Sequence, residues 1–261
     1  MAVVAVSRKK HADLRVSSSN NFLHSFKDRP SLPLYGFEIG RLAGDYPLFF
    51  SPTEDTYGIS MMCAIDPSLG SVCMAENGDW AGLYVPAFLR QQPFSVLLNS
   101  EDDQQCVVCI DDESAALGEA GKALFDEGEP TEYLNHVTQF VRKLYEEGKQ
   151  TRLVIQAIQE ADLIVPWEIN VPRAEGETIK LTDKYRIDEG KLNTLEDRQW
   201  IDLKEIGALA IIYGQLFSQN NLDKLVAAHN SLNAHNQGGS NSSLDFLLDD
   251  DEKFSLNFDG I

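Results

Sequence analysis

Residues 80–94 read WAGLYVPAFLRQQPF and place aromatic rings, two prolines and one arginine together without an acidic residue. Trp, Tyr and Arg are the residue types that dominate binding hot spots. An arginine that turns inward needs a carboxylate partner, which an acid elsewhere in the chain could supply. We therefore predict a binding site for an anion or a carboxylate here, and the alternative is a rigid packed corner without a ligand. The predicted site consists of Trp80, Tyr84, Arg90, Asp111 and Glu38.

The two prolines define the local structure expected for this stretch. Pro86 follows a short apolar run and suits the first position of a helix, whereas Pro93 forces the residue before it out of the helical region. We predict a strand, one helical turn over residues 87–90 and then another strand. The rings of the aromatic residues around this turn would be buried.

Two further groups have the residue types of metal sites. His11 and Asp13 have the H-x-D spacing of a non-haem iron site, in which both ligands share one face of a strand. No second histidine occurs in the expected setting, so a partly exposed edge strand explains the pair better. Residues 111–113 are three consecutive acids, which can hold Mg²⁺ or Ca²⁺, although an acidic turn is the better interpretation. We predict no metal site and no cofactor.

The cysteines favour a structural role. Four cysteines in 261 residues do not suggest a disulfide scaffold. Cys106 and Cys109 have the C-x-x-C spacing of zinc and redox sites, but Cys-Val-Val-Cys-Ile is typical of a buried strand. Residues i and i+3 of a strand point to opposite faces, so these two thiols cannot share a metal or a disulfide. We interpret both as small buried hydrophobic residues.

The charge balance excludes several classes of partner. The chain has 41 acidic and 22 basic residues and a net charge of −19, which repels phosphate backbones and anionic lipid. No run approaches the roughly 18 apolar residues that a spanning helix needs. We predict no nucleic-acid partner and no membrane span. The first ten residues place an apolar run before a basic cluster, the reverse of a secretory signal, so we expect a cytoplasmic protein.

Strands should dominate the first half of the chain. Short apolar runs separated by Gly, Pro, Asp and Asn predict strands throughout residues 21–115, with a possible first strand at residues 12–16. The Asn77-Gly78 pair predicts an antiparallel hairpin between residues 71–75 and 80–84.

Helices should dominate the second half. Apolar residues at helical spacing predict a helix over residues 131–160, which Gly148 could bend or split. A strand pair should follow over residues 162–187, and helices from residue 202 onward. We predict an α+β fold in one domain with an antiparallel N-terminal β-rich half, a central helix, a β-hairpin and C-terminal helices.

The C-terminus differs from the rest of the chain. Residues 233–243 are mostly Asn, Gly and Ser, which predicts a flexible linker, and an acidic tail with apolar anchors follows. Such a tail suits a segment that orders on a partner, and the alternative is a passive solubilising tail. We predict three parts: a flexible N-terminus (1–9), a folded domain (10–232), and the linker with its tail (233–261). The predicted partner-binding residues of the tail are Phe246, Leu247, Leu248, Phe254 and Phe258.

Several short motifs occur together in a distinctive order. The most specific is Gly82-Leu-Tyr-Val-Pro-Ala-Phe-Leu-Arg-Gln-Gln-Pro-Phe94. The others are His11-Ala-Asp-Leu-Arg15, Leu42-Ala-Gly-Asp-Tyr-Pro47, Cys109-Ile-Asp111, Leu124-Phe-Asp-Glu-Gly-Glu-Pro130, Ile212-Tyr-Gly-Gln-Leu216 and Asn221-Leu222. With these motifs the chain resembles the SapC family of bacterial proteins from about His11 to Leu232. The family is named after a surface-layer gene cluster, and the resemblance brings no catalytic residue set.

The resemblance and the residues together support three functional hypotheses. We predict a non-catalytic binding or accessory protein of a bacterial surface or uptake system, which recognises a small molecule or a protein partner. The second hypothesis is an enzyme of unrecognised type acting on a small anionic or peptide-like substrate. The third is an exported surface-layer-associated component, which would require export without a signal peptide. The oligomeric state is left open.

Overall fold

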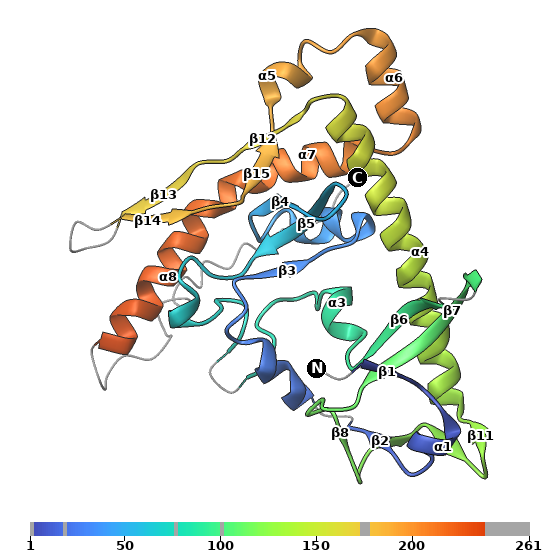
Figure 1. Cartoon of the computed structure of the whole chain (residues 1–261). Helices are drawn as coiled ribbons and strands as arrows, with labels where there is room; N and C mark the ends of the chain where they lie inside the picture. The colour runs from blue at the N-terminus through green and yellow to red at the C-terminus, as the bar shows by residue number, and fades with distance from the viewer. Residues whose placement is uncertain (1–2, 18–19, 76–77, 100–101, 173–177, 238–261) are drawn as a thin grey trace, which may run out of the picture.

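Antiparallel sheets and packed helices build the molecule, which confirms the α+β fold (Figure 1). The computed structural model describes residues 3–17, 20–75, 78–99, 102–172 and 178–237. The largest sheet has the order β12-β15-β4-β5-β3, formed by Ile164–Pro166, Tyr185–Ile187, Leu48–Pro52, Tyr57–Met62 and Ser31–Pro33. A second sheet has the order β1-β7-β6, formed by Val3–Ala5, Asp102–Asp111 and Phe94–Asn99.

Smaller strand pairs and eight helices complete the described part of the chain. A short sheet has the order β8-β2-β9, formed by Leu117–Gly118, Arg15–Val16 and Lys122–Ala123. Strands β10 (Phe125–Asp126) and β11 (Glu129–Pro130) pair, as do β13 (Ile169–Pro172) and β14 (Thr178–Leu181). The α-helices are α1 (Arg8–His11), α2 (Ile39–Leu42), α3 (Ala87–Arg90), α4 (Glu132–Glu160), α5 (Glu189–Leu192), α6 (Asp197–Glu205), α7 (Leu209–Ser218) and α8 (Leu222–Gln237). The 3₁₀ turns are η1 (Asn20–Phe26), η2 (Gly36–Glu38), η3 (Pro67–Leu69) and η4 (Gln219–Asn221).

Helix α4 joins two hydrophobic cores, and Figure 1 shows it running beside both larger sheets. Its first half packs Leu134 and Val141 into a core that includes Phe94, which we call the second core. Its second half packs Ile155 into the main core, which includes Phe50. The Thr131 hydroxyl accepts a hydrogen bond from the Leu134 amide and caps the helix start. The helix runs through Gly148 without a break, so the predicted helix is confirmed as one element.

Polar side chains of α7 connect it to the largest sheet. Strands β4 and β15 share only the Tyr185–Phe50 pair, so backbone groups nearby need other partners. The Gln215 side chain accepts from the Ile187 amide at 2.9 Å and donates to the Leu48 carbonyl at 3.0 Å. The Ser218 hydroxyl accepts from the Leu48 amide at 3.0 Å. Both side chains are fully buried, and they supply hydrogen bonds that β-ladder pairing does not.

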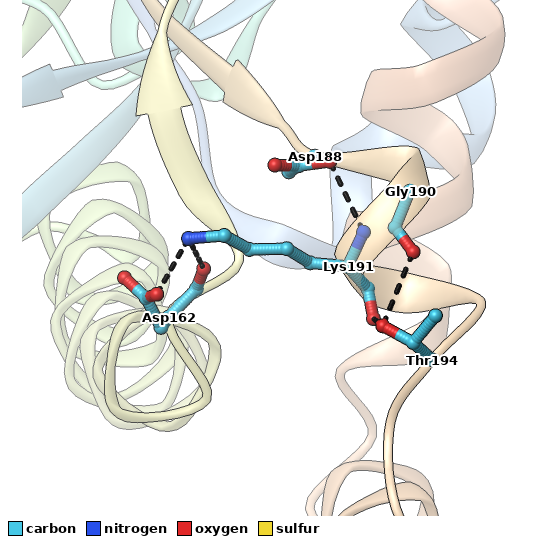
Figure 2. A network of polar contacts seen from close by, with 5 residues as sticks. All are labelled: Asp162, Asp188, Gly190, Lys191 and Thr194. Carbon is cyan, nitrogen blue, oxygen red and sulfur yellow. Dashed lines mark hydrogen bonds and ion pairs between the residues drawn. The ribbon is translucent and has the colours of Figure 1, made fainter.

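A polar network fastens α5 to the end of α4 (Figure 2). The Lys191 ammonium reaches the Asp162 carboxylate, and it donates to the Asp162 carbonyl at 3.2 Å. Asp188 caps the same helix, since its carboxylate accepts from the Lys191 amide at 3.1 Å. The ion pair is solvent-exposed, so we expect it to contribute only about 0–1 kcal/mol to stability.

Three expectations from the sequence differ from the structure. Where we expected a flexible N-terminus, Val3–Ala5 form strand β1 against the end of β7, because the apolar run completes the edge of that sheet. The strand expected at residues 12–16 is limited to Arg15–Val16. The predicted 71–84 hairpin is reduced to one antiparallel bridge between Met74 and Trp80.

The strand predicted around Cys106 and Cys109 is confirmed, but the prediction that both thiols are buried is correct for Cys109 alone. Cys106 and Cys109 both lie in β7, and Cys109 is buried whereas Cys106 is partly exposed. All four thiols are free. No helix within the described ranges is long and apolar enough to cross a membrane.

Candidate functional site

Glu38 lies at the centre of the candidate site. It ends η2 and is completely buried. One carboxylate oxygen, Oε2, accepts from the Tyr35 amide at 3.0 Å. The other, Oε1, accepts from the Tyr84 hydroxyl at 3.0 Å and from the Ala87 amide at 2.7 Å. Burial of a carboxylate is costly unless it is hydrogen-bonded, and these three donors provide that compensation.

Tyr84 connects this buried carboxylate to two surface arginines. The Arg90 guanidinium donates through Nη2 to the Tyr84 hydroxyl at 2.8 Å and through Nε to the Val85 carbonyl at 3.0 Å. Its carbon Cζ lies 5.2 Å from the centre of the Tyr84 ring, and Cζ of Arg41 lies 5.3 Å from the same centre. Both distances permit cation–π attraction. We call Glu38, Arg41, Tyr84 and Arg90 the Tyr84 hub.

In the described part of the chain, no acid neutralises the positive charges of the two hub arginines. Neither Arg41 nor Arg90 forms an ion pair with a carboxylate among the described residues. Arg90 reaches Glu38 only through the Tyr84 hydroxyl, and it also lies over the Phe140 ring at 5.4 Å. Aromatic rings therefore hold the guanidinium in place without neutralising it.

The pKa of Tyr84 supports a fixed hydrogen-bond direction within the hub. Partial burial raises this pKa above its ordinary value of 10.0, and the nearby Glu38 charge raises it further, whereas Arg90 acts in the opposite direction. The phenol therefore stays protonated at neutral pH. It can donate its only proton to Glu38 while accepting a hydrogen bond from Arg90.

Trp80 has a supporting position beside the hub. Its indole Nε1 donates to the Tyr84 carbonyl at 2.9 Å and fixes the turn that presents Tyr84. The ring packs near Tyr46, with centroids 6.4 Å apart. A side chain on Gly82 would collide with this pair, since its Cβ would lie 2.4 Å from the Tyr46 hydroxyl. The turn explains why residues 80–84 form no regular strand.

Asp111 is separate from the hub. It ends β7, where its carboxylate accepts from the Glu113 amide at 3.3 Å. Its own amide donates to the Pro93 carbonyl at 3.0 Å. Asp111 thus stabilises the turn after the strand, as the acidic-turn interpretation of residues 111–113 requires, and neither its hydrogen bonds nor those of Arg90 join the two residues. The structure brings together Glu38, Tyr84, Arg90 and Trp80 from the predicted site but not Asp111.

His11 and Asp13 do not share the face of a strand. His11 is buried at the end of α1, where its Nδ1 accepts from the Ser7 amide at 3.0 Å. This helical position, with its local hydrogen bond, replaces the strand that an H-x-D metal pair needs. No group of three or more candidate metal ligands occurs within the described ranges. The predicted tail residues 246–248, 254 and 258 lie outside the described residues.

A pocket of about 330 Å³ adjoins the hub and shares Arg90 with it. Its apolar lining consists of Val16, Phe22, Leu23, Val85 and Leu89. Its polar lining consists of Ser17, Arg90, Gln92, Lys122 and Tyr133. Leu23 and Leu89 belong to the main core, whereas Val16 belongs to the second core. We call this cavity the seam pocket, because it lies where the two cores meet.

Sequence reasoning did not find several residues of this region. Arg41 was missed although it lies three residues after Glu38, and Lys122 and Tyr133 were missed because only folding brings β9 and α4 to Arg90. Lys122 lies over the Tyr133 ring at 5.1 Å. Arg41, Lys122 and Tyr133 are cationic or aromatic, as the predicted site residues Arg90 and Tyr84 are. Residue type alone, however, does not indicate which of the many cationic and aromatic residues of the chain lie close together in the fold.

Tyr84→Phe tests the hydrogen bonds of the hub. The change removes the hydroxyl that joins Arg90 to Glu38 and keeps the ring under both guanidiniums. We expect the free energy of unfolding to fall by about 1–2 kcal/mol, because one carboxylate hydrogen bond is lost. Urea unfolding measures this difference. Tyr213→Phe, at an exposed position on α7, is the matched control and should change stability by less than about 0.5 kcal/mol.

The comparisons with known proteins identify a family and no more. A family model described as SapC matches residues 6–225. This range contains the hub and the lining of the seam pocket. No curated protein and no solved structure gives a match.

Proposed function

Because this chain belongs to the SapC family, we propose that it is a non-catalytic binding or accessory protein of a bacterial surface or uptake system. The Tyr84 hub recognises an anionic group on its ligand or partner. The placement in a surface system follows the name of the family, which comes from a surface-layer gene cluster. We also propose that the chain is made in the cytoplasm.

One observation carries the proposal: two guanidiniums meet at one tyrosine without an acidic partner among the described residues. Acids outnumber bases by 41 to 22 in this chain, so an unneutralised pair of cations is unexpected on its surface. Arg41 and Arg90 are both exposed and both lie within 5.3 Å of the Tyr84 ring centre. Preorganised cations lose less conformational entropy when they bind an anion.

The internal bonding of the hub favours binding over catalysis. The Tyr84 hydroxyl donates to Glu38 and accepts from Arg90, so its hydrogen-bonding groups are already used. The Glu38 carboxylate accepts three hydrogen bonds and is completely buried. A general base must reach a substrate proton, and this carboxylate faces protein donors instead. The guanidiniums are the groups of the hub that face solvent.

Ligand-dependent stabilisation of Arg90 variants tests the proposal. An anion that binds only the folded chain raises its melting temperature. We expect glutamate or benzoate, added at constant ionic strength, to raise the Tm of the wild-type chain and not that of Arg90→Ala. Differential scanning fluorimetry gives the readout, with chloride as the reference salt.

A matched variant makes this test specific. Arg198→Ala removes another exposed arginine, on α6, and should respond to the anions as the wild type does. Arg90→Lys keeps a positive charge but loses the fork geometry, so a partial response is expected. Equal Tm shifts for wild type and Arg90→Ala would contradict the assignment of anion recognition to the hub.

A further inference from the structure

We infer that the seam pocket holds a small organic acid, with its apolar body inside the pocket and its carboxylate between Arg90 and Lys122. This inference rests on the proposed function, since Arg90 belongs to both the hub and the pocket. It adds the chemical class of the ligand and a second cationic contact. Lys122 does not belong to the hub, so a Lys122 variant tests the pocket assignment separately from the proposed function.

The size and lining of the pocket suit an amphipathic ligand. Its volume of about 330 Å³ lies at the lower end of the range for small-molecule sites, about 300–1,000 Å³. Leu23 and Leu89 are buried aliphatic side chains that line it, and Phe22 adds an aromatic ring. A ligand body placed there would exchange contact with water for contact with apolar carbon.

The charges of the pocket specify an anion. Arg90 and Lys122 are its charged lining residues, and no acidic side chain lines it among the described residues. Lys122 lies 5.1 Å from the centre of the Tyr133 ring, and Arg90 lies over the Tyr84 and Phe140 rings. Neither cation has a carboxylate partner in the described ranges. A bound carboxylate would give both cations an anionic partner.

The surrounding backbone favours a carboxylate over a phosphate. Phosphate sites commonly use free backbone amides at a helix start or in a turn. The Ala87 amide at the start of α3 already donates to Glu38. Arg90 uses Nε and Nη2 within the protein, so Nη1 is its nitrogen without a hydrogen bond in the described part. A singly charged carboxylate matches this limited donor set, and its apolar body matches the lining.

Isothermal titration calorimetry of the purified full-length chain tests the inference, with 3-phenylpropanoate as the probe. We expect the acid to bind and its neutral amide, 3-phenylpropanamide, to bind at least tenfold more weakly, because the amide lacks the charge that both cations recognise. Inorganic phosphate should also bind at least tenfold more weakly, because it cannot use the apolar lining. No binding of the acid, or equal binding of the amide, overturns the inference.

Lys122→Gln separates the inference from the proposed function. Lys122 is exposed, so the variant should fold, and we expect its affinity for 3-phenylpropanoate to fall about tenfold. Lys143→Gln, at an exposed lysine on α4, is the matched control and should bind as the wild type does. If binding depends on Arg90 but not on Lys122, the hub recognises the anion and the pocket assignment is wrong. If it depends on neither residue, both ideas fail.

Discussion

Glu38→Ala is expected to lower the free energy of unfolding by about 3–5 kcal/mol, the largest effect of any single change considered. Alanine would leave the Tyr35 amide, the Ala87 amide and the Tyr84 hydroxyl without their acceptor. An unsatisfied buried donor costs roughly 1–3 kcal/mol. Since Glu38 is completely buried, water cannot readily replace the carboxylate. Urea or thermal unfolding measures the loss.

Two further variants show whether the loss comes from these hydrogen bonds. Glu38→Gln keeps one oxygen for Tyr84 and Ala87 but turns an NH₂ group toward the Tyr35 amide, so we expect a smaller loss of about 1–3 kcal/mol. Glu54→Ala removes an exposed acid and should change stability by less than about 0.5 kcal/mol. A Glu38→Ala chain as stable as Glu54→Ala would show that the carboxylate does not hold the corner together.

Gly214→Ala should produce the second large effect. Gly214 lies on α7 where it meets α2, and an added Cβ would lie 2.1 Å from Cγ2 of Ile39. Ile39 is completely buried and cannot move aside without displacing its neighbours. We expect the free energy of unfolding to fall by about 1–3 kcal/mol, the usual cost of overpacking a core. Chemical denaturation at several urea concentrations measures it.

Gly40→Ala is the control for this prediction. Gly40 lies on α2, and an added Cβ there would have nothing within 4 Å. Alanine should be neutral or stabilise the chain by up to about 1 kcal/mol, because it loses less backbone entropy than glycine. Similar losses for Gly214→Ala and Gly40→Ala would argue against close packing of α2 and α7 as the cause.

The long regular elements could be predicted from the sequence, because their patterns are local. Helix α4 has an apolar stripe, a threonine cap and 29 residues, so its helical period dominates over the single glycine inside it. Strands β4 and β5 were visible as apolar runs bounded by turn residues. The hairpin of β13 and β14 was visible for the same reason.

Segments whose conformation depends on distant partners were less predictable. Residues 80–84 contain β-forming aromatics, yet the Trp80 indole bonds the Tyr84 carbonyl and closes a turn instead. Strand β1 forms only because β7 offers it a free edge. Such outcomes depend on tertiary contacts that outweigh local propensity.

The candidate site was predictable in part. Residue types within one short motif indicated Tyr84 and Arg90. Glu38 was named as one of two possible carboxylate partners for an inward Arg90, but Arg90 is exposed and reaches Glu38 only through the Tyr84 hydroxyl. The same reasoning could not choose between Glu38 and Asp111, since the choice depends on where η2 and β7 lie relative to α3. Lys122 enters the region through β9, and no local pattern connects that strand to the motif.

Native mass spectrometry of the chain, purified gently from its own host, tests the central claim most directly. The bare chain has a mass of 29.1 kDa. We predict added mass from a small organic acid or a protein partner on the wild type, and its loss from Arg90→Ala but not from Arg198→Ala. A bare mass for the wild type, or the same added mass on Arg90→Ala, would contradict a binding function centred on the Tyr84 hub.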